Sequence, residues 1–150
     1  MTDRGWGRAG AGLFALTALA GAALQSRNAI DRDVGYYLYA LGRMAAGDRV
    51  IGADPPLYLT DLLASNVLLY APAAGLMQLG LPALPAVGGM VALLALVAAA
   101  FVVRLTAAPG QGPARAAMLG TLGLFAFLFP VDMFGQREHI FVLLILPYLC

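Results

Sequence analysis

The chain has 150 residues, of which 61% are hydrophobic and only 11% are charged, and its formal net charge is +1. Soluble domains have about 25% charged residues, so the composition excludes an ordinary water-soluble domain and indicates a membrane protein. The near-neutral charge and the lack of a basic run give no indication of a nucleic-acid partner. The single cysteine, Cys150, excludes an internal disulfide.

The first predicted element is an apolar segment at residues 9–25, preceded by Arg4 and Arg8. One interpretation is a transmembrane helix whose N-terminus lies in the cytoplasm. The other is a cleaved signal peptide, because Ala20-Gly21-Ala22 resembles a cleavage site. Both interpretations place the following residues outside the cytoplasm.

Residues 26–85 are expected to form an extracytoplasmic loop, because their first half contains many Arg and Asp residues. Apolar residues recur at helical spacing over 34–46, which predicts a short amphipathic helix on the membrane surface. Gly47-Asp48 is expected to end this helix. Residues 57–80 are apolar but interrupted by polar residues and a proline, so they are expected to be interfacial or re-entrant, although a full crossing stays open.

Two clean transmembrane segments follow at residues 86–103 and 116–134, and another begins at 140–150. The loop between the first two, residues 104–115, has two Arg and no acidic residue, which predicts a cytoplasmic location. That orientation requires residues 57–80 not to cross the membrane. The last apolar run stops after 11 residues at the end of the chain, whereas a span needs about 20, so we expect an N-terminal fragment of a longer protein.

Two polar clusters are then expected on the same, extracytoplasmic side: Asp31-Arg32-Asp33 and Gln136-Arg137-Glu138-His139. In an extended segment the two aspartates of the first cluster point to one face, and a carboxylate there could serve as a general base. The alternative for Asp33 is an N-cap of the helix that starts at Val34.

The order of these features resembles the GT-C membrane glycosyltransferases, such as the protein mannosyltransferases and the aminoarabinose transferases of lipid A. The resemblance extends over roughly residues 9–105 and, more loosely, over the Gly135–His139 cluster. The matching residues are Asp31-Arg32-Asp33, Tyr36-Tyr37, Gly47-Asp48 and Asp54-Pro55-Pro56-Leu57. It implies an all-α, polytopic transmembrane protein with a GT-C-like N-terminal module, whose extracytoplasmic first loop contains short amphipathic helices.

The resemblance also implies an enzyme that moves a sugar, with inversion, from a polyprenyl-phosphate carrier to a glycan, lipid or protein acceptor. Its active site would face the outside of a bacterial inner membrane. Asp33 is then the expected base, with Asp31 in reserve, and Arg137, His139 and Tyr37 are candidates for binding the substrate or lipid phosphate. No cofactor is expected, although the D-x-D pair leaves a divalent metal open. The fragment alone is expected to be inactive.

Two other classes of protein remain open at this point. In a transporter or lipid flippase subunit, Asp132 and the interrupted segment 57–80 would line a path through the membrane. In a non-catalytic membrane scaffold, the polar clusters would be solvated loops without chemistry.

Overall fold

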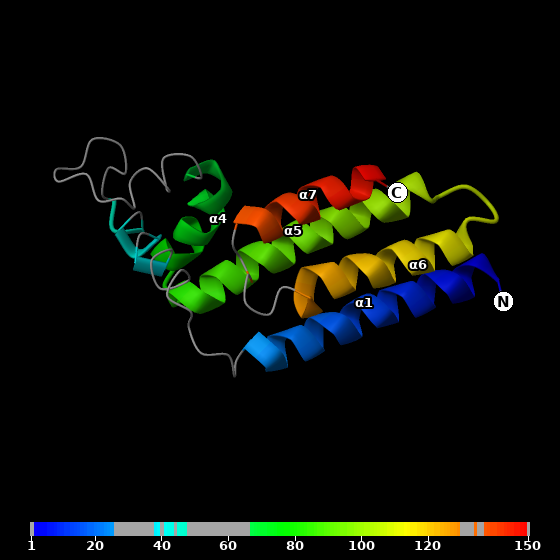
Figure 1. Cartoon of the computed structure of the whole chain (residues 1–150), viewed down its shortest axis with the longest axis horizontal. Coiled ribbons are helices and arrows are strands. Elements are labelled where there is room, and N and C mark those ends of the chain that lie inside the picture. Colours follow the sequence, from blue (N-terminus) through cyan, green and yellow to red (C-terminus); the bar gives the residue numbers. More distant parts are fainter. Residues whose placement is uncertain are drawn as a thin grey trace. The chain divides into compact units, whose positions relative to one another are not determined.

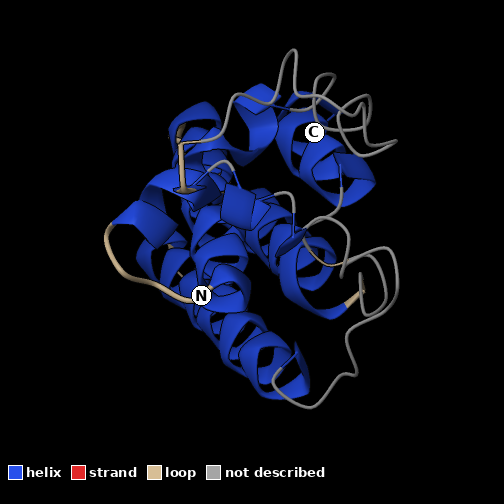
Figure 2. Cartoon of the chain, turned by 90° about the vertical axis from the view of Figure 1, so that its left-hand side faces the viewer, coloured by secondary structure: helices blue, strands red, loops and turns tan. Residues whose placement is uncertain are grey.

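The computed structural model describes residues 2–25, 38–39, 41–43, 45–47, 67–129, 134 and 137–149. All regular elements within these ranges are helices, and the described residues contain no strand (Figure 2), which confirms the predicted all-α class there. They are α1 (Asp3–Gln25), α4 (Val67–Gln78), α5 (Ala83–Leu105), α6 (Gly112–Gly123), the π-helix η1 (Leu124–Leu128) and α7 (Arg137–Leu149), as labelled in Figure 1.

The chain divides into two compact units. The first unit comprises Met1–Asn28, Ala92–Phe134 and Glu138–Cys150, and the second comprises Ala29–Val91 and Gly135–Arg137. Most of the packing that can be described in detail lies in the first unit, between α1 and the continuous helix formed by α6 and η1.

Helix α1 runs parallel to α6 and η1, and we call these elements the helix pair (Figure 1). The direction follows from the register, because residue numbers rise together along both partners. Close approaches join Gly10 to Ala116, Leu13 to Gly120, Phe14 and Thr17 to Gly123, and Gly21 to Phe127. Both helices therefore begin at one end, the N-terminal end of the pair, and finish at the other, its C-terminal end.

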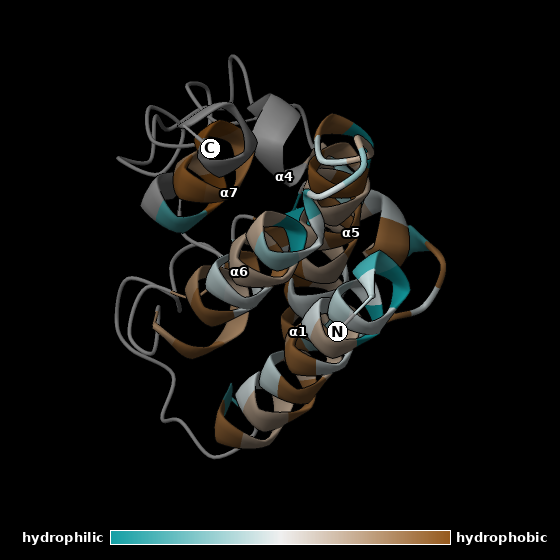
Figure 3. Ribbon diagram, turned by 90° about the vertical axis from the view of Figure 1, so that its right-hand side faces the viewer, coloured by the Kyte–Doolittle hydropathy of each residue, from teal (hydrophilic) through white to brown (hydrophobic). Residues whose placement is uncertain are grey.

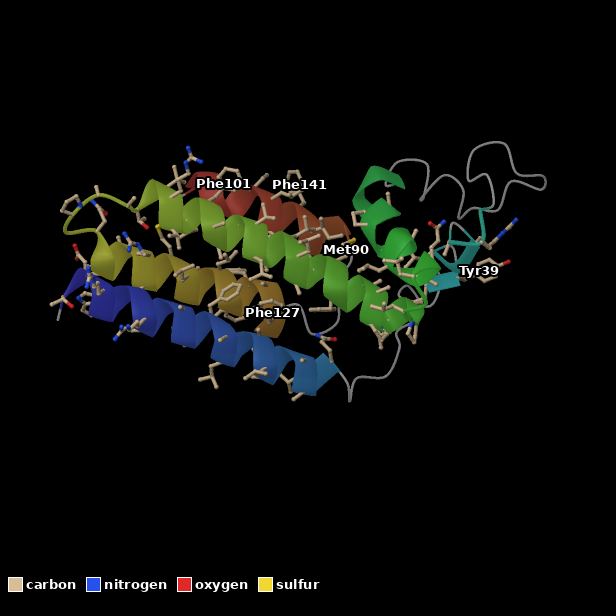
Figure 4. The ribbon with its side chains drawn as sticks, turned by 180° about the vertical axis from the view of Figure 1, so that it is seen from behind. Tyr39, Met90, Phe101, Phe127 and Phe141 are labelled. Atoms are coloured by element: carbon tan, nitrogen blue, oxygen red, sulfur yellow. The ribbon has the colours of Figure 1, made fainter. Side chains whose placement is uncertain are left out.

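Glycines allow the two backbones of the helix pair to approach closely. A Cβ atom placed on Gly10 would lie 2.8 Å from the Cα atom of Ala116, and one on Gly21 would lie 2.5 Å from the carbonyl oxygen of Phe127. Small residues at such positions are typical of helix association in membranes, where packing replaces the hydrophobic effect. The rings of Phe14 and Phe127 add an edge-to-face contact at 5.7 Å, and Figure 4 shows Phe127 between η1 and α1.

The N-terminal end of the pair is fixed by hydrogen bonds to the loop that precedes α6. Thr2 caps α1, since its Oγ1 atom accepts a hydrogen bond from the Gly5 amide at 3.3 Å. The Asp3 carboxylate accepts a second bond from the Gly110 amide at 2.9 Å. Gly110 has a φ of +81°, which favours glycine at this turn. The start of α1 is thereby joined to the α5–α6 loop.

The loop between α5 and α6 comprises residues 106–111 and is shorter than the predicted 104–115. Both ends of the predicted loop are helical. Arg104 lies in the last turn of α5, where a cation interacts favourably with the helix dipole. Pro113 lies in the first turn of α6, where its missing amide costs nothing. These two residues, which interrupt the apolar pattern, are compatible with helix ends.

Thr106 and Arg115 close this loop. The buried Thr106 hydroxyl donates to the Val102 carbonyl at 2.7 Å and accepts from Nε of Arg115 at 3.1 Å. Nη2 of Arg115 also donates to the Thr106 carbonyl. The end of α5 is thus attached to the first turns of α6.

Replacing Thr106 by valine should lower the thermal stability of the detergent-solubilised protein. The isosteric change removes both hydroxyl bonds, and each such bond is worth about 1 kcal/mol. Thr121→Val is the matched control, because the Thr121 hydroxyl makes no hydrogen bond within the described residues. Equal melting temperatures for the two variants would show that the Thr106–Arg115 contact does not stabilise the loop.

In the second unit, α4 contacts the first turns of α5. A Cβ atom on Gly89 would lie 3.1 Å from Cδ1 of Leu76, and Figure 1 shows α4 running across α5 rather than along it. Gln78 donates to the Ala45 carbonyl at 3.3 Å. Helical residues 38–39, 41–43 and 45 lie within the predicted surface helix 34–46, and Gly47, with a φ of +86°, follows them as predicted.

Two of the helices, α1 and α5, are long and apolar enough to cross a membrane. Each has 23 residues, which gives about 34 Å at ~1.5 Å per residue, more than the ~30 Å of a hydrocarbon core. Large apolar side chains on α1 face outward, with Leu16 62% and Leu19 71% exposed. Figure 3 shows polar residues gathered near the chain's N-terminus and apolar residues along the helices.

The helix bounds differ from the predicted segments at several ends. Helix α1 ends at Gln25 as predicted, but it begins at Asp3 rather than at residue 9, because the Thr2 cap and the Asp3 bond extend it. Helix α5 exceeds the predicted 86–103 at both ends. The continuous helix Gly112–Leu128 starts and ends earlier than the predicted 116–134.

Candidate functional site

The predicted site residues belong to the two segments that follow the C-terminal end of the helix pair. Gly21, in the last turns of α1, contacts Phe127 of η1. The chain therefore leaves α1 at Gln25 and leaves η1 at Leu128 from the same end of the pair. Asp31, Asp33 and Tyr37 lie outside the described residues, as does Asp132.

Arg137 is the first residue of α7, and its side chain is outside the description. Residues 137–139 of the second polar cluster form the first turn of this helix, which therefore begins three residues before the predicted segment 140–150. Arg and Glu are good helix formers, and an acid such as Glu138 suits the first turn.

His139 is the one predicted site residue whose side chain is described, and it is buried with 5% of its surface exposed. Its imidazole interacts with the backbone of Ala126 and Phe125 in η1. The Phe134 ring lies 5.4 Å from it, centroid to centroid, at 41°. The sequence makes His139 a candidate for binding the carrier phosphate or for closing the pocket; in the structure its side chain packs the start of α7 against η1.

The π-helix that receives His139 is a feature that the sequence did not reveal. The Phe129 amide donates to the Leu124 carbonyl, five residues earlier, at 3.0 Å. A π-turn is wider than an α-turn and interrupts the regular α-helical hydrogen-bond ladder, and such turns occur frequently at functional sites. Here the interruption coincides with the backbone groups of Phe125 and Ala126 that His139 contacts.

The glycine contacts of the helix pair were also missed, although the sequence contains a signal for them. Gly112, Ala116 and Gly120 recur at intervals of four residues, the spacing of small residues at membrane helix interfaces. Arg115 was used only as a loop charge and Asp3 was not singled out from the sequence, whereas both make specific bonds at the N-terminal end of the pair.

Within the described ranges, no group of three or more His, Cys, Asp or Glu side chains is placed to hold a metal ion. The arrangement that can be described consists of the closely packed helix pair and the π-turn of η1, whose backbone the buried His139 contacts. In comparisons with known proteins, no protein-family model, curated protein or solved structure matches the chain.

Proposed function

We propose that the chain belongs to a polytopic membrane glycosyltransferase of the GT-C type, which transfers a sugar from a polyprenyl-phosphate carrier at the extracytoplasmic face. The observation that supports this best is the parallel direction of α1 and α6. It favours a membrane topology in which the two polar clusters resembling the glycosyltransferase pattern face the same compartment.

The parallel direction restricts the number of crossings between the two helices. If α1 and α6–η1 span the membrane in the same sense, the chain must return once between them, and α5 provides that return. A second crossing by residues 57–80 would make α6 antiparallel to α1. Within the described residues, helix α4 of that segment has 12 residues, or about 18 Å, which is less than the ~30 Å of a hydrocarbon core.

Arginines favour one orientation for this bundle. Arg4, Arg8, Arg104 and Arg115 all lie in the terminal turns at the N-terminal end of the helix pair or in the adjoining turn of α5. Cytoplasmic ends of membrane helices are enriched in Arg and Lys. The opposite end, from which both polar clusters follow, would then face outward.

The chemistry of the proposed site assigns one task to each cluster. A carboxylate of Asp33 removes the proton from the acceptor hydroxyl, which is a weak nucleophile at neutral pH. Arg137 stabilises the departing lipid phosphate through a charge-assisted contact. The prenyl chain is accommodated along apolar helix surfaces, of which α5 exposes Leu93, Leu96 and Phe101.

The transporter alternative receives less support from the described helices. A transport path through a membrane needs polar or ionisable groups at depth. Within α1, α5, α6 and η1 the one acidic residue is Asp3, at the very start of α1.

Side-specific labelling of single cysteines tests this topology in intact cells. In a background with Cys150→Ser, cysteines at positions 33 and 137 should react with an impermeant maleimide from outside. A cysteine at position 110 should react only after permeabilisation, because Gly110 lies beside the start of α1. Labelling of 110 from outside together with protection of 137 would mean that residues 57–80 span, and the proposal of a common active face would fall.

A further inference from the structure

The arginines at the N-terminal end of the helix pair differ in whether their side chains form hydrogen bonds. Arg115 is held by Thr106. Arg4, Arg8 and Arg104 are exposed, and their side chains make no hydrogen bond or ion pair within the described residues. The acid at this end, Asp3, is already bonded by the Gly110 amide. This end therefore presents guanidinium groups that the described part of the protein does not neutralise.

Arg4 and Arg8 are followed on α1 by an exposed apolar surface, which comprises Gly12, Leu16 and Leu19. Arg4, Arg8, Gly12 and Leu16 follow one another at intervals of four residues, so they lie on neighbouring positions of one helix face. A Cβ atom on Gly12 would meet no atom within 4 Å. Below it, Leu16 and Leu19 are 62% and 71% exposed. This helix face thus combines two cationic side chains, a glycine with open space beside it, and two exposed leucines.

We propose that this face binds an anionic phospholipid. The lipid phosphate is held by the guanidinium groups of Arg4 and Arg8, which suit bidentate contacts to phosphate oxygens. An acyl chain lies over Gly12 and between the exposed leucines. Arg104, at the same end of the first unit, adds positive potential that attracts anionic headgroups.

The exposed apolar surface favours a lipid over a free phosphate ion. A free anion would need only the arginines, whereas the open space at Gly12 and the exposed Leu16 and Leu19 match a hydrocarbon chain. The site lies at the opposite end of the helix pair from the polar clusters, so it does not depend on the proposed sugar transfer. It depends only on α1 lying in a membrane.

The test is electron paramagnetic resonance of spin-labelled lipids around the whole chain in phosphatidylcholine vesicles. The quantity measured is the binding constant of labelled phosphatidylglycerol relative to labelled phosphatidylcholine. We expect wild-type protein to prefer phosphatidylglycerol, Arg8→Gln to lose roughly fivefold of that preference, and Arg4→Gln/Arg8→Gln to lose nearly all of it. Removing two arginines could change the orientation in which the protein inserts into the membrane. The single variant keeps Arg4, Arg104 and Arg115, so the positive charges that set the orientation remain.

Arg43→Gln/Arg49→Gln is the matched control, since it removes the same charge elsewhere in the chain. It should retain the wild-type preference. The proposal is overturned if this control and the Arg4/Arg8 variants lose the preference equally, or if the Arg8 variants retain it. It is also overturned if inorganic phosphate displaces the labelled lipid more than chloride does at equal ionic strength, because the site would then be one for the free anion.

Discussion

Replacing Gly21 by leucine is expected to separate α1 from η1 and to destabilise the protein by on the order of 3 kcal/mol, at the upper end of overpacking effects. A Cβ atom at this position would lie 2.5 Å from the Phe127 carbonyl oxygen and 2.6 Å from the Phe127 Cβ atom. One of these obstacles is backbone, so no rotamer change can make room. The helix pair must part or shift along its length.

Gly12→Leu is the control for this experiment. Gly12 lies on the same helix, but a Cβ atom there meets nothing within 4 Å, so this variant should fold as the wild type does. The intrinsic fluorescence of Trp6, the single tryptophan, reports on α1 during thermal unfolding in detergent. Identical unfolding of the Gly12 and Gly21 variants would show that α1 does not pack on η1.

The position of Gly21 also bears on the two interpretations of the first apolar segment. Cleavage at Ala20-Gly21-Ala22 would remove α1, the helix against which Gly112, Gly120 and Gly123 pack closely. Those glycines would then border an unfilled surface on α6. In the uncleaved chain α1 fills this surface, and the two interpretations of the segment therefore differ in whether the glycines of α6 stay covered.

Apolar periodicity predicted the helices well because it depends on local sequence. The end of the surface helix at Gly47 follows from turn chemistry, because this glycine has a φ of +86°. The starts were less predictable, since Asp3 is ordered by Gly110, a residue distant in sequence. A window of apolar residues contains no information about such a bond.

Candidate site residues were harder to place for the same reason. His139 stands in a polar stretch of the sequence, and its burial depends on the backbone of Phe125 and Ala126 in another helix. The π-turn that puts those groups within reach has no recognised residue signature in this apolar run. Arg137 and the Asp31–Asp33 pair rest on the sequence and its resemblance alone.

Asparagine at position 33 is expected to reduce sugar transfer by about 10²–10⁴-fold, the usual contribution of a general base. The substitution separates the two interpretations of Asp33. Asparagine caps a helix about as well as aspartate does, so a purely capping residue would tolerate it. Asparagine cannot accept the proton of the acceptor hydroxyl, so a base would not. Activity in membranes is measured as transfer from a panel of radiolabelled polyprenyl-phosphate sugars, with full-length protein and equal expression.

Asp31→Asn and Asp33→Ala make the outcome of this experiment unambiguous. If Asp33 is the base, Asp31→Asn should cost far less activity than Asp33→Asn, because Asp31 is only the reserve carboxylate. If Asp33 is only a cap, Asp33→Asn should keep wild-type activity and Asp33→Ala should lose stability, by about 1 kcal/mol. Full activity in Asp33→Asn therefore contradicts the proposed mechanism. Loss of transfer with unchanged thermal stability supports it, because a capping defect lowers stability before it lowers the rate.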